Sequence, residues 1–242
     1  MKDYYGWRAR IGLIYIADST VMEPELYAMA PEGVSIHTAR IDLADPSAKG
    51  LGEMMDGSGI EEATRLLGYA PLHVVTFGGT SASFLKGIGY DRSIIARMEE
   101  ILAGPPASTT STAAIRALRA VGAKRISFVS PYVSDLVELG RRFFSENGFE
   151  VTGAHGLGIA DDPGLNGLPL ERMYAFAKEV AEPQADAIFI SCTAVRTVGA
   201  IEALESDLGR PVISANQATF WDALRIAGVK GGKAGFGCLF DY

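Results

Sequence analysis

The sequence predicts an α/β fold in which two similar, doubly wound lobes each carry a central parallel sheet. Two observations support this prediction: strand-like apolar stretches alternate with amphipathic helix-like stretches, and the second half of the chain echoes the order of the first. Strands separated by helices of this length form βαβ units, whose strands run parallel. A chain of 242 residues can bury a sizeable core without disulfide bonds.

The first predicted strand, residues 10–16 (RIGLIYI), is a nearly continuous apolar run, as a buried strand is. Residues 34–41 (VSIHTARI) alternate between apolar and polar side chains and form the second predicted strand. The next strands are expected at residues 72–77, 125–129, 187–191 and 211–214. Amphipathic stretches between them predict helices at residues 60–67, 90–102, 111–121, 134–147, 170–181 and 194–208.

The similarity between the two halves of the chain places two turns in equivalent positions. One strand runs into Gly78-Gly79-Thr80-Ser81, and a later strand runs into Ser191-Cys192-Thr193-Ala194. Gly79 and Cys192 stand 113 residues apart, while the opening strands, aligned at Ile11 and Ile126, stand 115 apart. Since open α/β sheets bind ligands at the carboxyl ends of their strands, we expect the two turns to face each other across a cleft.

The domain boundaries follow from this echo. A linker near residues 107–113 and a return near residues 214–218 would separate the lobes. We therefore expect a first lobe of residues 1–110 plus 216–242, completed by the C-terminal tail, and a second lobe of residues 111–215.

Composition excludes several classes of protein. The formal net charge of −7 argues against a nucleic-acid partner, because phosphate contacts require clustered Lys and Arg. No apolar run approaches the roughly 18 residues of a membrane span, and residues 1–8 are too polar for a signal peptide. Two cysteines cannot build a disulfide framework and favour a reducing compartment. We expect a cytoplasmic protein with no membrane partner.

Cys192 is the sharpest candidate for chemistry. It follows an apolar strand and precedes a predicted helix, whose N-terminus would favour a thiolate and offer N–H groups to an anion. The alternative is a buried structural cysteine that packs as a small hydrophobe.

The turn at residues 78–83 is the second candidate. Its glycines allow close approach to a ligand, and its hydroxyls can donate to a carboxylate. An ordinary helix N-cap has the same composition.

Other polar residues give weaker signals. Residues 79–83 nearly match the G-x-S-x-G elbow of serine hydrolases, but Ser83 occupies the last glycine position. Metal-binding and nucleotide-binding motifs are missing from the sequence, so no metal and no cofactor is predicted. The residues without a predicted chemical role are His37, His73 and His155, which lack metal-ligand spacing, the pair Asp161-Asp162, which is expected in a loop, and Cys238 in the tail.

Several short motifs, in this order and spacing, make the chain similar to a known superfamily. It resembles the aspartate/glutamate racemase superfamily, in particular the branch of arylmalonate decarboxylases and maleate cis–trans isomerases, over nearly its whole length. The motifs are GTSASF at residues 79–84, PYVSDLVE at 131–138, SCTAVRT at 191–197, RPVISANQATFWDALRIAG at 210–228 and the end GFGCLFDY.

This resemblance implies two α/β lobes with the active site between them. Racemases and maleate isomerases of the superfamily place one cysteine on each lobe. Here the second-lobe position is Cys192, but the first-lobe position is Gly79. A two-base racemase needs a proton donor and an acceptor on opposite faces of one carbon, so Gly79 removes the usual scheme. Arylmalonate decarboxylases have the pattern found here, a G-T-S turn and one cysteine.

The resemblance therefore implies cofactor-independent decarboxylation of a disubstituted malonate. Loss of CO₂ leaves an enediolate, whose negative oxygens need prepositioned donors. The resemblance assigns this role to Thr80, Ser81, Tyr132 and the backbone N–H of Thr193, beside Gly79, and it makes Cys192 the acid that protonates one face. The thiol form of Cys192 is required for this step.

Some residues depart from the decarboxylase pattern. Residues 21–41 look more like maleate isomerases and the related ectoine-utilisation proteins, and Thr193-Ala194 replaces a Gly-Gly pair. Two alternatives therefore remain: an isomerase or racemase that works with one cysteine, and a catalytically degenerate dicarboxylate-binding protein. Relatives occur as monomers and as homodimers, so either state is expected.

Overall fold

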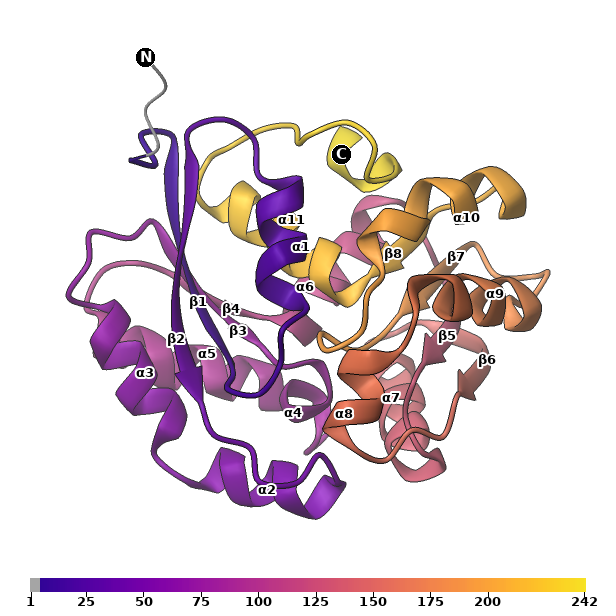
Figure 1. The fold of residues 1–242 in the computed structure, drawn as a ribbon, viewed down its shortest axis with the longest axis horizontal. Coiled ribbons are helices and arrows are strands. Elements are labelled where there is room, and N and C mark those ends of the chain that lie inside the picture. The colour runs from indigo at the N-terminus through magenta and orange to yellow at the C-terminus, as the bar shows by residue number, and fades with distance from the viewer. Residues whose placement is uncertain (1–4) are drawn as a thin grey trace.

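The computed structural model describes residues 5–242 and contains two four-stranded parallel sheets (Figure 1). The strand order is β2-β1-β3-β4 in the first sheet and β6-β5-β7-β8 in the second. The strands are β1 (Ala9–Ile16), β2 (Val34–Ile41), β3 (Val74–Gly78), β4 (Ala107–Thr109), β5 (Arg125–Ser130), β6 (Glu150–Gly156), β7 (Ala187–Ile190) and β8 (Val212–Ser214). The predicted fold class of two α/β lobes with parallel sheets is thus confirmed.

Helices connect these strands and cover the faces of both sheets (Figure 1). In chain order they are α1 (Met22–Met29), α2 (Ala48–Asp56), α3 (Gly59–Leu67), α4 (Thr80–Phe84), α5 (Tyr90–Leu102), α6 (Thr110–Ala120), α7 (Ser134–Glu146), α8 (Asp162–Gly167), α9 (Leu170–Val180), α10 (Ile201–Leu208) and α11 (Ala215–Ile226), with short 3₁₀ turns at Val198–Ala200 and Cys238–Asp241. None of the helices within residues 5–242 is long and apolar enough to cross a membrane.

The pairing of the strands repeats from one sheet to the other. In the first sheet Ile11 of β1 lies opposite Val74 of β3. In the second sheet Ile126 of β5 lies opposite Ala187 of β7. These pairs reproduce the two sequence offsets of 115 and 113 residues, so the turns at Gly79 and Cys192 occupy equivalent positions.

Two long buried helices join the lobes. Helix α6 follows β4 of the first sheet, α11 follows β8 of the second, and the two pack against each other near the centre of the molecule (Figure 1). The hydroxyls of Thr110 on α6 and Thr219 on α11 are 3.0 Å apart. Ser214 and Gln217 form a capping box that fixes where α11 begins.

Several predicted elements need correction. The predicted linker at 107–113 holds strand β4 and the start of α6, and the expected helix at 194–208 is α10 only from Ile201 onward. Residues 194–197 stay non-helical because the N–H groups of Thr197 and Val198 donate to the Glu25 carboxylate of α1. Elements that were not predicted are α1, α2, α4, α8, α11, β4 and β6.

Candidate active site

A cavity of about 110 Å³ lies at the carboxyl ends of both sheets, where the two lobes meet. Its walls come from the end of β1 and from the segments that follow β1, β2 and β3 and the equivalent β5, β6 and β7. The cavity brings together all the residues predicted to form the site: Gly79, Thr80, Ser81, Tyr132, Cys192 and Thr193. This position agrees with the general location of ligand sites in open α/β sheets.

Cys192 has a left-handed backbone, with φ of 99°, and a side chain that is 5% exposed. Its Sγ accepts a hydrogen bond from the N–H of Ala194 at 3.4 Å. Burial raises the pKa of the Cys192 thiol to about 11, despite this hydrogen bond. The expected thiolate at a helix N-terminus is therefore wrong: residues 193–197 form a loop, and at neutral pH the side chain is a protonated thiol.

Tyr132 follows β5 and lies on the same wall as Cys192. The Ser191 hydroxyl donates to the Tyr132 hydroxyl at 3.4 Å, and Phe84 packs edge-on against the Tyr132 ring. Burial raises the pKa of Tyr132 well above its usual value, and the neighbouring Cys192 adds to this effect. The phenol thus remains a hydrogen-bond donor throughout the neutral range.

Thr80 lines the cavity and carries a buried, unpaired hydroxyl. The residue is 2% exposed, and within residues 5–242 its Oγ1 has no hydrogen-bond partner. An unpaired buried hydroxyl costs free energy unless a ligand completes it. Ser83, by contrast, bonds to the Gly79 carbonyl at 2.6 Å and to the Ser111 hydroxyl at 2.7 Å. It is a structural residue at the position where the hydrolase elbow has its last glycine.

Thr193 connects the two lobes beside the cavity. Its hydroxyl donates to the Gly78 carbonyl of the first lobe at 3.2 Å. Its own carbonyl accepts from the Tyr15 hydroxyl at 3.2 Å and from the Asn216 amide at 3.3 Å. These bonds hold the turn that carries Cys192 against the turn that carries Gly79.

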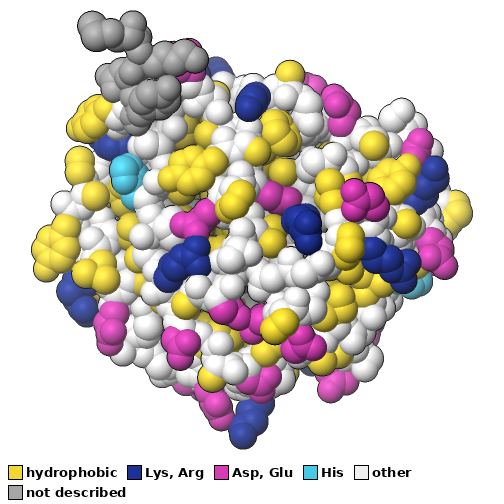
Figure 2. All heavy atoms as spheres, in the orientation of Figure 1, with side chains coloured by type: hydrophobic (Ala, Val, Ile, Leu, Met, Phe, Trp, Pro, Cys, Tyr) yellow, Lys and Arg dark blue, Asp and Glu magenta, His cyan; other side chains and the backbone are white. Residues whose placement is uncertain are grey.

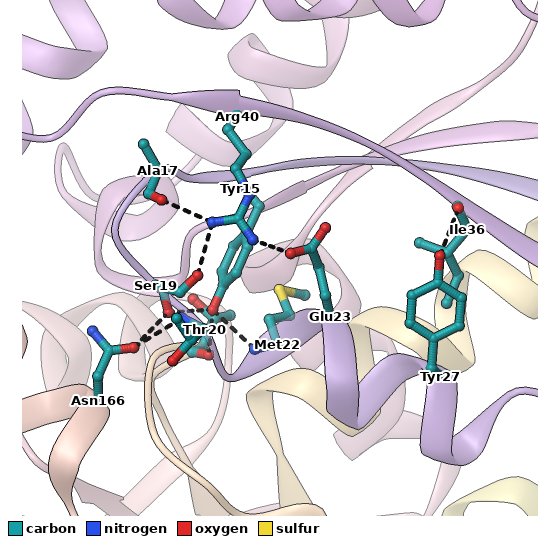
Figure 3. Close-up of polar contacts among 11 residues, drawn as sticks. Tyr15, Ala17, Ser19, Thr20, Met22, Glu23, Tyr27, Ile36, Arg40 and Asn166 are labelled. Atoms are coloured by element: carbon teal, nitrogen blue, oxygen red, sulfur yellow. Dashed lines mark hydrogen bonds and ion pairs between the residues drawn. The ribbon is translucent and has the colours of Figure 1, made fainter.

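The segment between β1 and α1, which forms part of the cavity wall, is fixed from both sides (Figure 3). From β2, the Arg40 guanidinium donates to the carbonyls of Ala17 at 2.8 Å and Ser19 at 2.9 Å, and it pairs with Glu23. From α8 of the second lobe, Asn166 accepts from the Ser19 hydroxyl and from the N–H of Thr20. The wall is therefore held in one position.

Asp162 also lines the cavity, although the pair at 161–162 was expected in a loop without a chemical role. Asp161 caps helix α8 by accepting from the N–H of Gly164 at 2.7 Å, and this places Asp162 in its first turn. Burial and the nearby Asp18 raise the pKa of Asp162 to about 6. The available signal was the capping pattern Asp161-Asp162-Pro163, which marks a helix start.

The rest of the cavity wall is mainly apolar. Among the residues that line it, Asp162 is the only one with a charged side chain. Figure 2 shows that acidic side chains also predominate on the surface around α8 and α2. The apolar residues that line the cavity include Leu43, Leu51, Val133, Leu136, Ile159 and Leu165. A ligand carboxylate here would be held by neutral donors, without a cationic side chain.

The remaining candidates lie outside the cavity wall. His73 accepts from the N–H of Arg10 at 3.0 Å, His155 lies 3.2 Å from Glu182, and His37 lies 2.9 Å from the Ser35 hydroxyl. The thiol of Cys238 donates to Glu205 at 3.0 Å. No group of three or more His, Cys, Asp or Glu side chains with the geometry of a metal site occurs in the described part of the chain.

A cavity between two equivalent α/β lobes, with one cysteine at a strand end, defines a class of racemase-like enzymes. A family model described as arylmalonate decarboxylase matches residues 11–240. An arylmalonate decarboxylase of Bordetella bronchiseptica is 36% identical over 172 residues, which are 69% of this chain and 71% of that protein. A maleate isomerase of Geobacillus stearothermophilus is 26% identical and covers 91% of this chain and 92% of its own length.

Solved structures agree with these similarities. A mutant maleate isomerase of Pseudomonas putida, solved with maleate, has a TM-score of 0.90 and 27% identity over 96% of this chain and 97% of its own. A liganded double mutant of arylmalonate decarboxylase has a TM-score of 0.89 and 29% identity over 96% and 99%. The chain belongs to the arylmalonate decarboxylase family. Its relatives include both decarboxylases and isomerases, and all of these are enzymes.

Proposed function

We propose that the protein is a cofactor-independent decarboxylase of disubstituted malonates and a member of the lyases. The observation that carries this proposal is the combination in one apolar cavity of a single protonated thiol, Cys192, with a glycine, Gly79, at the equivalent position. One acid on one face can protonate a carbanion. Two-sided proton exchange requires a second group.

The reaction follows from the groups around the cavity. The bond between the α-carbon and one carboxylate breaks, CO₂ leaves, and the electron pair forms an enediolate on the remaining carboxylate. The hydroxyls of Thr80, Ser81 and Tyr132 and the N–H of Thr193 hold the enediolate oxygens. Loss of charge is favoured in the apolar part of the cavity, because a carboxylate is poorly solvated there. Cys192 then donates its proton to the α-carbon.

A direct assay tests this proposal. Purified protein is incubated with 2-methyl-2-phenylmalonate and with dialkylmalonates that carry two different substituents, and CO₂ release and product chirality are measured. We expect one product enantiomer, and we expect Cys192→Ser to lower kcat by about 10² to 10⁴. Cys238→Ser is the matched control and should leave kcat unchanged. Undiminished turnover in Cys192→Ser would disprove the mechanism.

A second candidate function is favoured by the maleate isomerases that match 91% or more of this chain. An isomerase or racemase working with Cys192 alone would exchange the α-hydrogen with deuterated water, or interconvert maleate and fumarate, without releasing CO₂. Incubations with 2-phenylpropionate in deuterium oxide and with maleate, followed by NMR, distinguish it from the decarboxylase. Tight dicarboxylate binding without turnover would instead indicate a degenerate binding protein.

A further inference from the structure

The side chain of Phe77 lies directly behind Gly79. Phe77 is the fourth residue of β3 and is fully buried. A Cβ atom at position 79 would stand 2.6 Å from Cζ and 2.9 Å from Cε1 of the Phe77 ring. Carbon atoms do not approach this closely without a shift, and a core aromatic ring has little room to move.

The backbone of Gly79 does not itself require glycine. Its φ of −144° and ψ of 99° are extended values that any residue adopts. The Phe77 ring is therefore what excludes a side chain at position 79.

The second lobe contains the equivalent pair with the volumes distributed differently. Positions 77 and 79 correspond, at the offset of 113 residues, to Ile190 and Cys192. Ile190 is also buried, at the end of β7. The first lobe thus pairs a large side chain, Phe77, with a glycine. The second lobe pairs two side chains of intermediate size, Ile190 and Cys192.

We propose that Phe77 is a specificity-determining residue that limits this site to a single proton donor. This inference rests on the proposed function and deepens it. The ring prevents a functional side chain at position 79, so only the Cys192 face of a bound carbanion can receive a proton. With the smaller Ile at position 77, as at position 190, a side chain at position 79 would gain the space that the Phe77 ring now fills.

Two thiols on equivalent turns would permit proton exchange at the α-carbon. The Cys introduced by Gly79→Cys, as thiolate, removes the α-proton of a carboxylic acid, and the electron pair moves into the carboxylate to form an enediolate. The Cys192 thiol then donates its proton to the opposite face. One C–H and one S–H bond form while one of each breaks, so no co-reactant is needed.

Thermal unfolding tests the steric part independently of catalysis. Gly79→Ala adds only the Cβ atom, and we expect it to lower Tm by about 5 °C or more. Phe77→Ile alone also lowers Tm, because it leaves a cavity. In the double variant Phe77→Ile/Gly79→Ala the two losses should partly cancel. Additive losses, or an unchanged Tm in Gly79→Ala, would overturn the inference.

Hydrogen exchange tests the catalytic part. Loss of the α-hydrogen of 2-phenylpropionate in deuterium oxide is followed by NMR for Gly79→Cys and for Phe77→Ile/Gly79→Cys. We expect at least about tenfold faster exchange in the double variant. Equal rates, or no exchange in the double variant, would overturn the role of Phe77 in reaction type.

Absence of CO₂ release by the unmodified protein would contradict the proposed function alone, and the Tm comparison would still decide the steric claim.

Discussion

At the scale of single residues, Cys192 combines an unfavourable backbone with a proposed chemical role. Its φ of 99° lies in a region that residues with a Cβ atom rarely adopt, and such positions cost about 1–3 kcal/mol. Hydrogen bonds of Thr193 to the other lobe and the bond from Ala194 to the thiol hold the turn in place. Cys192 is therefore less favourable for stability at this position than a glycine would be.

This strain predicts an unusual order of stability. We expect Cys192→Gly to be about 1 kcal/mol more stable than Cys192→Ala, because glycine adopts a positive φ freely. Urea unfolding of both variants measures the difference. The matched control is Ala103→Gly at the end of α5, where φ is 51° and glycine should again stabilise. A more stable Cys192→Ala would contradict the strain argument.

Asp162 predicts a pH dependence of substrate binding. Its pKa of about 6 makes it neutral below that pH and a carboxylate above it. A charged Asp162 repels a dianionic malonate by about 1 kcal/mol, so KM should rise about fivefold as pH increases through 6. Steady-state kinetics between about pH 5 and pH 8 measure this rise in KM.

Two variants identify the group responsible. Asp162→Asn should remove this rise. Asp18→Asn should move it to lower pH, because it removes the repulsion that raises the pKa of Asp162. Titration of the substrate itself is the same for all three proteins. An unchanged profile in Asp162→Asn would exclude Asp162 as the cause.

The sequence predicted the polar residues of the site better than its walls. Gly79, Thr80, Cys192 and Thr193 were found because each follows an apolar strand, where a parallel sheet presents its carboxyl ends. Asp162 and Phe77 were missed for a physical reason. Their importance depends on contacts with Asp18 and Gly79, and no local pattern encodes those contacts.

At the scale of elements, helix α1 holds the segment that follows Cys192. The buried carboxylate of Glu25 accepts hydrogen bonds from the N–H of Thr197 at 2.6 Å, the N–H of Val198 at 3.1 Å and the Asn216 amide at 2.6 Å. Burial raises the pKa of Glu25, while these donors oppose the shift. The Glu25 carboxylate thus binds the free N–H groups of the segment that follows the Cys192 turn.

Glu25→Gln should disturb this segment. The new NH₂ group would point at N–H donors, which the carboxylate oxygen had accepted from. We therefore expect a loss of about 2 kcal/mol in unfolding free energy. Because the turn that carries Cys192 also loosens, kcat should fall more than KM changes. Glu23→Gln on the same helix is the control, since Glu23 pairs with Arg40 away from the Cys192 segment. Similar losses in both variants would argue against a positioning role.

Elements with strong local patterns were predicted, and short ones were not. Strands β1, β3, β5 and β7 are apolar because helices cover both faces of each sheet. Strand β4 has only three residues, and helix α1 begins at Met22 without a side-chain cap, so neither gives a clear signal. The loop after Cys192 was predicted as helix because its composition suits one. Its tertiary bonds to Glu25 override that preference.

At the scale of the whole molecule, the lobes share one core. A single hydrophobic cluster includes residues of both sheets, and helices α6 and α11 pack against each other between them. The proposed division, residues 1–110 plus 216–242 and residues 111–215, cuts both α6 and α11 one residue after their starts. Two lobes joined in this way should not unfold separately.

We therefore expect a single unfolding transition. Urea unfolding is followed by far-ultraviolet circular dichroism and by tryptophan fluorescence, which reports on the buried Trp221 in α11 and on the exposed Trp7. The two curves should coincide, as they do for a cooperative unit. Separated midpoints would mean that the lobes are independent folding units.

The equivalent pairs at 77/79 and 190/192 have a practical consequence for protein engineering. Because the two turns follow equivalent strands of the two lobes, these four positions can be varied together in one small combinatorial library. Directed evolution of new stereochemical outcomes could therefore begin from side-chain combinations that this chain already accommodates, one lobe at a time.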